Sequence, residues 1–361
     1  MDRRVFLGSA ASTLLLPGCA TTIARAAPRG CLPPVNVAAE RVIRTVAGLR
    51  PYRAAGFVVR AEALGDKKLV HNYGHGGSGI TLSWGSSKLA TSLGLPGHQG
   101  PVAVIGAGVM GLTTARLAQE AGFQVNIYTK ALTPETTSNI AGGQFHPFGL
   151  YDHRRVTPEW RAQFLSALDY SWRRFQIMVG DDYGIRWLPT YVERSAGPER
   201  QLLPTFPPDN RALRPEEHPF PVTNMTRYTT IYVETGRFLR ELTRDVQIAG
   251  GTIRVRDFAT PADIAALPER LVFNCTGLGS RELFGDTELH PIRGQLAILI
   301  PQPEIRYAFM GEAGHMFPRA DGILLGGTWE HDEWDATPQA GDIARIVESH
   351  KELFAGFRCT A

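Results

Sequence analysis

The stretch "VAVIGAGVMGL", residues 102–112, predicts the first turn of a nucleotide-binding fold. Four apolar residues are typical of a buried strand, and Gly106, Gly108 and Gly111 then have the spacing G-x-G-x-x-G. A helical pattern follows up to Gly122, and "FQVNIY" has the pattern of a returning strand. In this context Gly106 makes the tight turn, Gly108 lets the backbone approach a pyrophosphate, and Gly111 lets helix and strand pack closely. The phosphates would lie at the helix N-terminus, where free N–H groups and the helix dipole favour anions.

The position after the returning strand departs from the usual dinucleotide-binding pattern. An acidic residue often follows that strand and accepts a hydrogen bond from the ribose of the adenosine. Here the sequence is "YTKA", residues 128–131, and Lys130 cannot act as an acceptor. Contact with the ribose is therefore expected from backbone groups, from Thr129 or through water.

Length, composition and charge limit the class of protein. With 361 residues, of which 43% are hydrophobic, the chain can form two lobes around a sizeable core. A formal net charge of only +3 gives no sign of a nucleic-acid partner. The four cysteines, Cys19, Cys31, Cys275 and Cys359, lack the spacing of metal ligands. Free thiols are the preferred interpretation, and a bridge between Cys31 and Cys359 is the alternative.

An export signal is expected over residues 1–26. Arg3 and Arg4 form a twin arginine, an apolar run covers residues 5–16, and small residues come after it. The apolar run is too short to span a bilayer as a helix.

Two ways of processing this segment fit the pattern. Cleavage after Ala26 fits an ordinary signal, and lipid attachment at Cys19 fits a lipoprotein-like box. Residues 27–36 then form a linker. A periplasmic or cell-envelope protein is therefore expected, and a cytoplasmic protein with an N-terminal tail is the alternative.

A second glycine-rich segment precedes the first one. Residues 69–85 read "LVHNYGHGGSGITLSWG", with an apolar start, a glycine cluster and an apolar-aromatic run. Before it, "GFVVRAE" and "KLVHNY" flank Gly65 and Asp66 and predict a β-hairpin. After it, "SWGSSKLATSLGL" predicts a short helix that ends near Gly94. Residues 94–100, "GLPGHQG", predict a flexible connector.

The pattern changes after residue 150 and predicts a second lobe. Residues 160–179 have the periodicity of an amphipathic helix, and a proline-rich region of strands and loops covers residues 188–221. Later segments return to the first lobe, among them "VFNCTG", a strand pattern that ends in small residues. Strand patterns in "GQLAILI", "GHMF" and "GILLGGTWE" predict an open sheet, and residues 342–354 predict a final helix.

Several of these segments together resemble the D-amino-acid oxidase family of FAD-dependent enzymes. The segment "LVHNYGHGGSGITLSWGSS" resembles the signature of that family, and "GLRPYR", "VIGAGVMGL", "TPETTSNIAGG", "VFNCTG" and "RGQLAIL" each resemble a family block. In the family, "GLRPYR" and "HNYGHGG" come near the C-terminus, whereas here they precede the nucleotide fingerprint. The resemblance therefore implies a circular permutant whose former termini are joined through "GLPGHQG". Permutation is tolerated where the termini lie close together on a surface.

The resemblance also implies a fold and a division into domains. The fold would be α/β, with a Rossmann-like FAD-binding domain and a second, α+β substrate domain built on an open mixed or antiparallel sheet. The FAD-binding domain would be discontinuous, with residues 37–150 and 228–290. The substrate domain would comprise residues 151–227 and 291–358.

FAD is the implied cofactor, and the resemblance places it residue by residue. The pyrophosphate would lie on the fingerprint glycines, and the second glycine cluster would approach the flavin ring, where backbone N–H groups stabilise negative charge. A polar turn that caps a helix is the alternative for the hydroxyl cluster of residues 136–138. The expected cofactor-binding residues are Arg60, Gly76, Ser78, Gly79, Ile80, Thr81, Gly106, Ala107, Gly108, Gly111, Thr136, Thr137, Ser138, Gly143, Gln144 and Thr276.

Arg50, Gly77 and His315 are the catalytic residues that the resemblance implies. Arg50 would pair with the substrate carboxylate through the planar fork of its guanidinium. Typical members carry two tyrosines where this chain has Gly311 and His315, so a wider and more polar pocket is expected. His315 would hydrogen-bond the substrate or is a structural core histidine. Surface salt bridges are the alternative for Arg50 and Arg60.

The implied function is FAD-dependent oxidative deamination of D-amino acids to 2-oxo acids, ammonia and hydrogen peroxide. The partners would be a small amino acid and oxygen or another electron acceptor. No metal and no nucleic acid are expected, and a membrane is contacted only through a lipid at Cys19. The alternatives are an FAD-dependent amine or amino-acid dehydrogenase with another acceptor, and an exported flavin-binding protein that has lost its activity.

Overall fold

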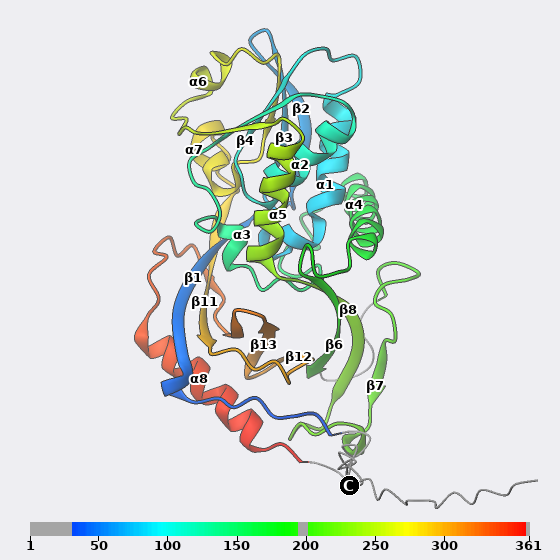
Figure 1. The fold of residues 1–361 in the computed structure, drawn as a ribbon, viewed down its shortest axis with the longest axis vertical. Coiled ribbons are helices and arrows are strands. Elements are labelled where there is room, and N and C mark those ends of the chain that lie inside the picture. Colours follow the sequence, from blue (N-terminus) through cyan, green and yellow to red (C-terminus); the bar gives the residue numbers. More distant parts are fainter. Residues whose placement is uncertain (1–30, 194–200, 359–361) are drawn as a thin grey trace, which may run out of the picture.

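Two β-sheets organise the chain, and each draws its strands from distant parts of the sequence (Figure 1). The computed structural model describes residues 31–193 and 201–358. The predicted export signal, residues 1–26, lies outside the described residues. The two sheets and their helices confirm the predicted α/β class.

The first sheet has six strands in the order β2-β3-β10-β4-β5-β9, and every neighbouring pair except β2–β3 is parallel. The antiparallel pair β2–β3 confirms the predicted hairpin, and Gly65 in its turn has a φ of +60°. The strands β4 and β5 flank the helix α2, which confirms the predicted strand–helix–strand unit. The strands are β2 (Val58–Leu64), β3 (Lys67–Tyr73), β4 (Val102–Ile105), β5 (Val125–Thr129), β9 (Thr252–Val255) and β10 (Leu271–Asn274).

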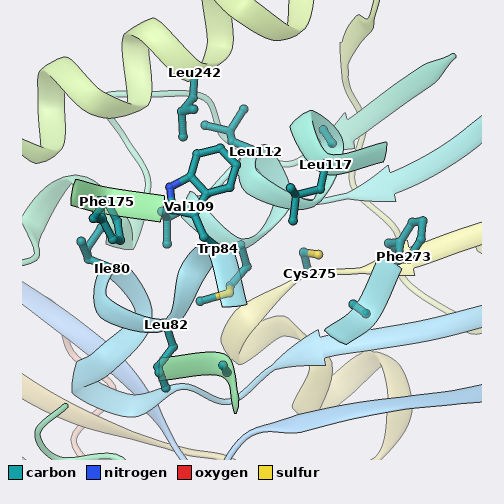
Figure 2. Close-up of a cluster of buried hydrophobic side chains, with 14 of the residues drawn as sticks. Ile80, Leu82, Trp84, Val109, Leu112, Leu117, Phe175, Leu242, Phe273 and Cys275 are labelled. Carbon is teal, nitrogen blue, oxygen red and sulfur yellow. The ribbon is translucent and has the colours of Figure 1, made fainter. Parts of the chain in front are cut away.

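Helices cover both faces of this sheet. On one face the main hydrophobic core joins the strands to α1, α2, α4 and α5, and its buried side chains include Trp84, Leu112, Phe175 and Leu242 (Figure 2). On the other face a smaller cluster packs α6 and α7 against the strands. The helices are α1 (Gly79–Gly94), α2 (Val109–Glu120), α3 (Thr137–Ile140), α4 (Pro158–Ile177), α5 (Thr235–Ile248), α6 (Pro261–Ala265) and α7 (Ser280–Phe284), with the 3-10 helices η2 (Gly76–Ser78) and η4 (Gly277–Gly279).

Helix α1 begins earlier than the sequence predicted, because the residues of "GITL" already form its first turn. It crosses α4 at Gly85, where a Cβ would lie 1.8 Å from the carbonyl oxygen of Ala167. The Gly85 N–H donates to Ser171 Oγ at 2.8 Å in the same contact. This close approach packs α4 against the helices of the first sheet, although the sequence assigned residues 151–227 to the substrate domain.

The second sheet has nine strands in the order β1-β11-β14-β13-β12-β6-β8-β7, with β15 paired to β11. It is mixed, because β6 and β12 run parallel while β1 and β11 are antiparallel. Strand β1 lies in this sheet, although the sequence assigned residues 37–150 to the cofactor-binding domain. The strands are β1 (Val42–Tyr52), β6 (Ile185–Glu193), β7 (Arg211–Leu213), β8 (Met225–Val233), β11 (His290–Leu299), β12 (Ala308–Gly311), β13 (Gly314–Arg319), β14 (Gly322–Gly326) and β15 (Glu330–His331).

The helix α8 (Ala340–Ala355) covers the face of the second sheet that points away from the first sheet (Figure 1). Its residues Ile346 and Phe354 are buried in one cluster with Val35 and Val37 from the N-terminal segment. The 3-10 helices η1 (Ala39–Arg41) and η3 (Pro215–Glu217) complete the described elements. The opposite face of this sheet is therefore left to face the first sheet.

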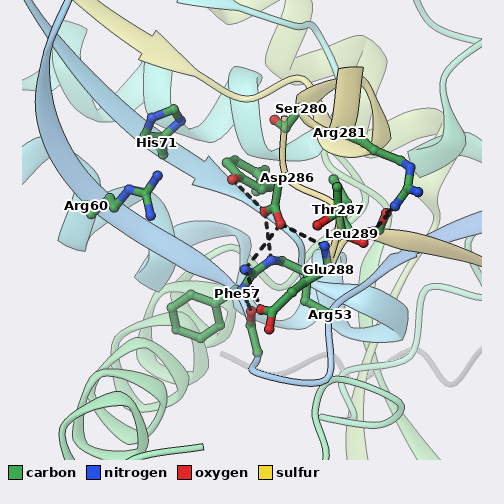
Figure 3. Close-up of polar contacts among 12 residues, drawn as sticks. Arg53, Phe57, Arg60, His71, Ser280, Arg281, Asp286, Thr287, Glu288 and Leu289 are labelled. Carbon is green, nitrogen blue, oxygen red and sulfur yellow. Dashed lines mark hydrogen bonds and ion pairs between the residues drawn. The ribbon is translucent and has the colours of Figure 1, made fainter. Parts of the chain in front are cut away.

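An ion-pair cluster ties the end of β1 to the loop before β11 (Figure 3). Arg53 Nε donates to Asp286 Oδ2 at 2.8 Å, and Arg53 Nη2 donates to Glu288 Oε2 at 2.8 Å. The Tyr73 hydroxyl, at the end of β3, donates to the same Asp286 oxygen at 2.8 Å. Because Arg53 and Asp286 are mostly buried, this cluster holds together strands of both sheets.

One cysteine, Cys31, differs from the expectation of free thiols. Cys31 is disulfide-bonded, and its partner lies outside the described residues. The preference for a free thiol is therefore wrong for Cys31, whereas Cys275 is free and buried.

The described residues contain neither a candidate membrane-spanning helix nor a candidate metal-binding cluster. Among residues 31–193 and 201–358, no helix combines the length and apolar character needed to cross a membrane. In that part of the chain, no group of three or more histidine, cysteine or carboxylate side chains is placed to hold a metal ion.

Candidate active site

A cavity of about 730 Å³ is lined by elements of both sheets. The first sheet contributes the turn after β4, the loop after β3, and the ends of β5 and β9. The second sheet contributes β1, β11 and β13. Arg50 and Gly106, which belong to different sheets, line the same cavity.

The fingerprint glycines have different roles in the turn between β4 and α2. Gly106 has a φ of +106°, and a Cβ there would lie 2.5 Å from the carbonyl oxygen of Cys275. A Cβ on Gly111 would lie 1.9 Å from the carbonyl oxygen of Gly106, so this glycine lets the helix pack on the turn. Gly108 faces the cavity, and Ser138 Oγ, at 3.2 Å, is the only atom within 4 Å of its Cβ position.

The N-terminus of α2 opens on the cavity without a side-chain cap from its own N-cap residue, Gly108. One N–H of the first turn, that of Val109, donates to Ser138 Oγ at 3.0 Å. The remaining N–H groups of the turn and the helix dipole favour an anion such as a pyrophosphate. The hydroxyl cluster of residues 136–138 lines the cavity here and also begins the short helix α3.

The second glycine cluster forms a loop that lies directly against Phe148 and Gly149. Gly76 has a φ of +51°, and a Cβ there would lie 2.2 Å from the carbonyl oxygen of Gly149. The Gly77 N–H donates to that oxygen at 3.0 Å, and Ser78 Oγ donates to the carbonyl oxygen of Phe148 at 2.8 Å. Larger side chains at positions 76 and 77 would separate the two segments.

Buried polar side chains support this loop from behind. His75 Nε2 lies 2.6 Å from Ser86 Oγ, which donates to Asn72 Oδ1 at 2.6 Å. Asn72 Nδ2 donates in turn to Ser87 Oγ and Thr114 Oγ1. Burial lowers the pKa of His75 to about 3, so its imidazole is neutral near pH 7. The chain of hydrogen bonds ties the loop to α1 and α2.

Arg50 brings a buried positive charge to the cavity from β1. Its guanidinium fills the space over Gly294 on β11, where a Cβ would lie 2.4 Å from both Nη atoms. Its Nη1 lies 3.5 Å from the carbonyl oxygen of Ile292, and its Cζ lies 4.9 Å from the ring centroid of Trp329. Among the described residues, no carboxylate forms an ion pair with Arg50, and burial lowers its pKa to about 10. The guanidinium therefore stays charged at neutral pH and is available to a ligand carboxylate.

His315 adds a polar group to the same cavity from β13. It lies opposite Gly326 of β14, where a Cβ would lie 2.2 Å from the imidazole Nε2, so the glycine makes room for the ring. Burial is the main cause that lowers the pKa of His315 to about 3, with smaller contributions from Arg50 and His350. The neutral ring can donate one hydrogen bond and accept another without adding a second charge.

The carboxylate of Asp257 lies beside Lys130 at the edge of the first sheet where β5 and β9 end. Lys130 Nζ forms an ion pair with Asp257 Oδ2 at 3.0 Å, and both residues line the cavity. The strands β5 and β9 are parallel neighbours, so their carboxyl ends meet at one edge. An acidic residue absent after β5 is therefore present after β9, where it pairs with Lys130, and spacing alone does not reveal this pairing.

The structure brings most of the predicted site residues to this cavity. Those that line it are Arg50, Gly76, Gly77, Gly79, Ile80, Gly106, Ala107, Gly108, Thr136, Thr137, Ser138, Thr276 and His315. Those that do not line it are Arg60, Ser78, Thr81, Gly111, Gly143 and Gln144.

Arg60 does not lie at the cavity, where its expected role in cofactor binding would require it. It belongs to the edge strand β2, its side chain is 60% exposed, and its Nη2 lies 3.5 Å from Glu62 Oε2 (Figure 3). An exposed pair of this kind contributes little to stability or binding. The structure therefore places Arg60 at the surface and outside the residues that line the cavity.

Thr81, Gly143 and Gln144 shape the wall of the cavity from outside it. Thr81 Oγ1 donates to the carbonyl oxygen of His146 at 3.1 Å and accepts from the His146 N–H at 3.0 Å. Gln144 Nε2 donates to Thr190 Oγ1 at 2.8 Å. Gly143 packs against β8 with a φ of +88°. These contacts connect the segment after α3 to α1 and to the second sheet.

Three residues that contact Arg50 or His315 escaped the sequence analysis: Gly294, which lines the cavity, Gly326, which lies against the His315 ring, and Trp329, which lies against Arg50. Both glycines stand inside strands, where a glycine marks a close approach of another group. That signal was present in "RGQLAIL" and "GILLGGTWE", but the group that approaches belongs to another strand. Trp329 follows β14, and nothing local in the sequence links it to Arg50.

Comparison with known proteins agrees with this geometry. The family model of the FAD-dependent oxidoreductases matches residues 16–93 and 101–360, which is most of the chain. The chain belongs to this family. The D-amino acid oxidase of Dugesia ryukyuensis is 29% identical over 270 residues, which cover 71% of this chain and 78% of the relative. The D-amino-acid oxidase of Streptomyces coelicolor is 32% identical over 263 residues, which cover 69% of this chain and 76% of the relative.

Solved structures share the fold at low sequence identity. Glycine oxidase from Geobacillus kaustophilus has a TM-score of 0.52 and 15% identity, over 73% of this chain and 81% of that chain. Iminodiacetate oxidase from Chelativorans has a TM-score of 0.53 and 15% identity, over 71% of this chain and 79% of that chain. These likenesses agree with the predicted fold, a Rossmann-like FAD-binding domain beside a substrate domain.

FAD is the cofactor of this oxidoreductase family, and the residues of the cavity fit it. The N-terminus of α2 has free N–H groups, and Gly108 leaves open the space that a pyrophosphate needs. The hydroxyls of residues 136–138 and Thr276 line the same cavity. The loop at Gly76 and Gly77 would then lie along the flavin, on the side where Arg50 and His315 are found.

Two glycine substitutions should separate FAD binding from folding. Gly108→Val fills the space for the pyrophosphate, so we expect a colourless protein whose apo form unfolds within about 0.5 kcal/mol of wild type. Gly111→Ala places a Cβ against the carbonyl oxygen of Gly106, so we expect the free energy of unfolding to fall by about 1–3 kcal/mol. Flavin absorbance and urea unfolding of the apoproteins measure the two effects. Full flavin content in the Gly108→Val protein would contradict this placement of the pyrophosphate.

The neutral state of His315 makes stability depend on pH in a defined window. In the unfolded chain this imidazole takes up a proton below its ordinary pKa of 6.5, whereas the folded chain holds it neutral down to about 3. The free energy of unfolding should therefore fall as the pH drops from 6.5 towards 3, by up to about 2 kcal/mol at pH 5. At a fixed FAD concentration, His315→Asn should lose less stability than wild type between pH 7 and pH 5. Parallel urea-unfolding curves for the two proteins would show that His315 is not held neutral.

Proposed function

We propose that this oxidoreductase deaminates D-amino acids oxidatively, with FAD as cofactor, to 2-oxo acids, ammonia and hydrogen peroxide. The main observation in support is Arg50, a buried guanidinium without a carboxylate partner in the described chain, which lies in the cavity that Gly106 and Gly108 also line. A substrate carboxylate supplies the missing counter-ion. The curated relatives named D-amino-acid oxidases support the choice of substrate class.

Binding and orientation are the main tasks of the protein. FAD, when bound, accepts the hydride that leaves the α-carbon of the substrate. Arg50 offers a planar fork that binds a carboxylate through two parallel hydrogen bonds, which restricts how the α-carbon is presented. Gly294 leaves the space that this guanidinium occupies. Positioning of this kind, in a cavity shielded from bulk water, accounts for much of the rate gain in such enzymes.

His315 acts as a neutral hydrogen-bonding group near the substrate. Because its pKa lies near 3, it stays uncharged where Arg50 is already positive. A neutral imidazole accepts a hydrogen bond from the substrate amine or donates one to its carboxylate, depending on its tautomer. It replaces an aromatic hydroxyl with a smaller polar ring, which fits a wide and polar substrate pocket.

We also propose that the chain order is circularly permuted relative to the family. The family model matches the chain in two segments on either side of residues 94–100, which supports a junction there. Val42 at the start of β1 and Phe357 near the C-terminal end pack against the same cluster on the outer face of the second sheet. Ends that lie on one surface can be joined without disturbing the core.

Export to an oxidising compartment is the third part of the proposal. Residues 1–26 have the pattern of a twin-arginine signal, and the disulfide at Cys31 is of a kind that persists outside the cytoplasm. Mass spectrometry of the protein from its native host should find a chain that begins after Ala26 or carries a lipid on Cys19. An unprocessed chain in the cytoplasm as the main species would contradict export.

Arg50→Leu tests the proposed function directly. Two charge-assisted hydrogen bonds are lost, so kcat/KM for a D-amino acid should fall by about 10²–10⁴-fold while FAD content and folding are kept. Arg50→Lys should restore little, because a point charge cannot form the planar fork. The decarboxylated amine of the same amino acid is the matched control, since it has no carboxylate to lose. Equal losses for the amino acid and the amine would mean that Arg50 has a structural role only.

A relinked chain tests the permutation. The new chain would begin at Pro101, run to Arg358, continue through a flexible linker of about ten residues, and end with residues 36–94. We expect it to fold, bind FAD and keep its activity, because no strand is interrupted. A chain opened between Leu296 and Ala297 with the same linker cuts β11 and should fail. Failure of both chains would argue against residues 36 and 358 lying close enough to be joined.

A further inference from the structure

We propose that Trp329 is a positioning residue for Arg50 and, through it, for recognition of the substrate carboxylate. The inference rests on the proposed function and adds a residue from the loop between β14 and α8. It concerns how the guanidinium is held in one orientation, which neither the fingerprint nor the glycine loop explains.

The guanidinium of Arg50 has few groups that fix its plane. Gly294 lies beneath it without a side chain, and the guanidinium's one hydrogen bond within the described part of the chain, to the carbonyl oxygen of Ile292, is long, at 3.5 Å. The Trp329 ring covers it from another side, with 4.9 Å between Cζ and the ring centroid. A cation over an indole face is attracted by the ring quadrupole, and the contact is stronger where water is excluded. Trp329 is therefore the side chain that limits the rotation of this guanidinium.

The indole is itself held in place. Its Nε1 donates to His331 Nε2 at 3.1 Å, and the ring of Phe148 packs against it edge-on at a centroid distance of 5.3 Å. A Cβ on Gly149 would lie 2.2 Å from Trp329 Cη2, so that glycine accommodates the far edge of the ring. An aromatic ring fixed by three neighbours can orient a flexible side chain at little further entropic cost.

The solvent exposure of Trp329 indicates that its role is not packing in a hydrophobic core. Trp329 is 38% exposed and Phe148 is 56% exposed, whereas the Arg50 guanidinium beneath them is largely buried. The two rings thus form a rim between Arg50 and solvent. Large apolar side chains at a surface that cover one buried charge fit a role in ligand recognition better than a role in folding.

The same loop supplies a matched control. Trp334 is 47% exposed and lies over Arg281, with 5.8 Å between Cζ and the ring centroid. Arg281 does not line the cavity, whereas Arg50 does. Replacing Trp334 therefore tests whether loss of any exposed indole from this loop disturbs the site.

The experiment compares Trp329→Leu, Trp329→Phe and Trp334→Leu in the FAD-loaded enzyme. The probe is 2-aminoisobutyrate, which has the amine and carboxylate of a substrate but no α-hydrogen, so it binds without reacting. Calorimetry should show its Kd rise about tenfold in Trp329→Leu, change about twofold in Trp329→Phe, and stay unchanged in Trp334→Leu. For a D-amino acid, KM should rise with the same pattern while kcat changes less, and kcat/KM for the decarboxylated amine should stay unchanged.

The outcomes separate this inference from the proposed function. An unchanged Kd in Trp329→Leu, or equal losses in Trp329→Leu and Trp334→Leu, would overturn the positioning role. A loss for the decarboxylated amine as large as that for the amino acid would also overturn it, because the effect would then not pass through the carboxylate. If Arg50→Leu binds 2-aminoisobutyrate as tightly as wild type, the proposed function itself fails, and the role of Trp329 fails with it.

Discussion

The antiparallel pairing of β1 with β11 is the contact on which the candidate active site depends. Its register sets Gly48 opposite Gly294 and Arg50 opposite Ile292. Diagonal neighbours on a sheet lie within reach of a long side chain, so Arg50 can extend over Gly294 only in this register. A shift by one residue would turn Arg50 to the other face of the sheet, away from the cavity. The ion pairs of Arg53 with Asp286 and Glu288 lie just beyond the end of β1 and help to hold this register.

In the cavity the guanidinium of Arg50 is charged, whereas the imidazoles of His75 and His315 are neutral. Arg50 keeps a charge without a partner among the described residues, and its burial lowers the pKa and costs stability. Burial holds His75 and His315 neutral, so neither imidazole adds a second positive charge beside Arg50. A substrate that carries a carboxylate would relieve the cost at Arg50. This arrangement explains how the cation of Arg50 can select substrates that carry a carboxylate.

Local features were predictable from the sequence, and contacts between distant segments were not. The fingerprint of Gly106, Gly108 and Gly111 specified its turn, because strand, glycines and helix are contiguous. The β2–β3 hairpin was found for the same reason. The position of Arg60 was not predictable, because its motif gives no sign that β2 is an edge strand with that side chain at the surface. The pairing of Lys130 with Asp257 and the cover of Trp329 over Arg50 depend on which strands become neighbours, and no local pattern encodes that.

The central claim is that this cavity binds an amino acid through its carboxylate so that the α-hydrogen passes to FAD. Anaerobic mixing of the FAD-loaded protein with the D- and L-forms of one amino acid tests it most directly, because the flavin loses its visible absorbance when it is reduced. We expect rapid bleaching with the D-form of at least one member of an amino-acid panel and little with the matching L-form. Absence of bleaching with every D-amino acid, or equal bleaching by both forms, would contradict it.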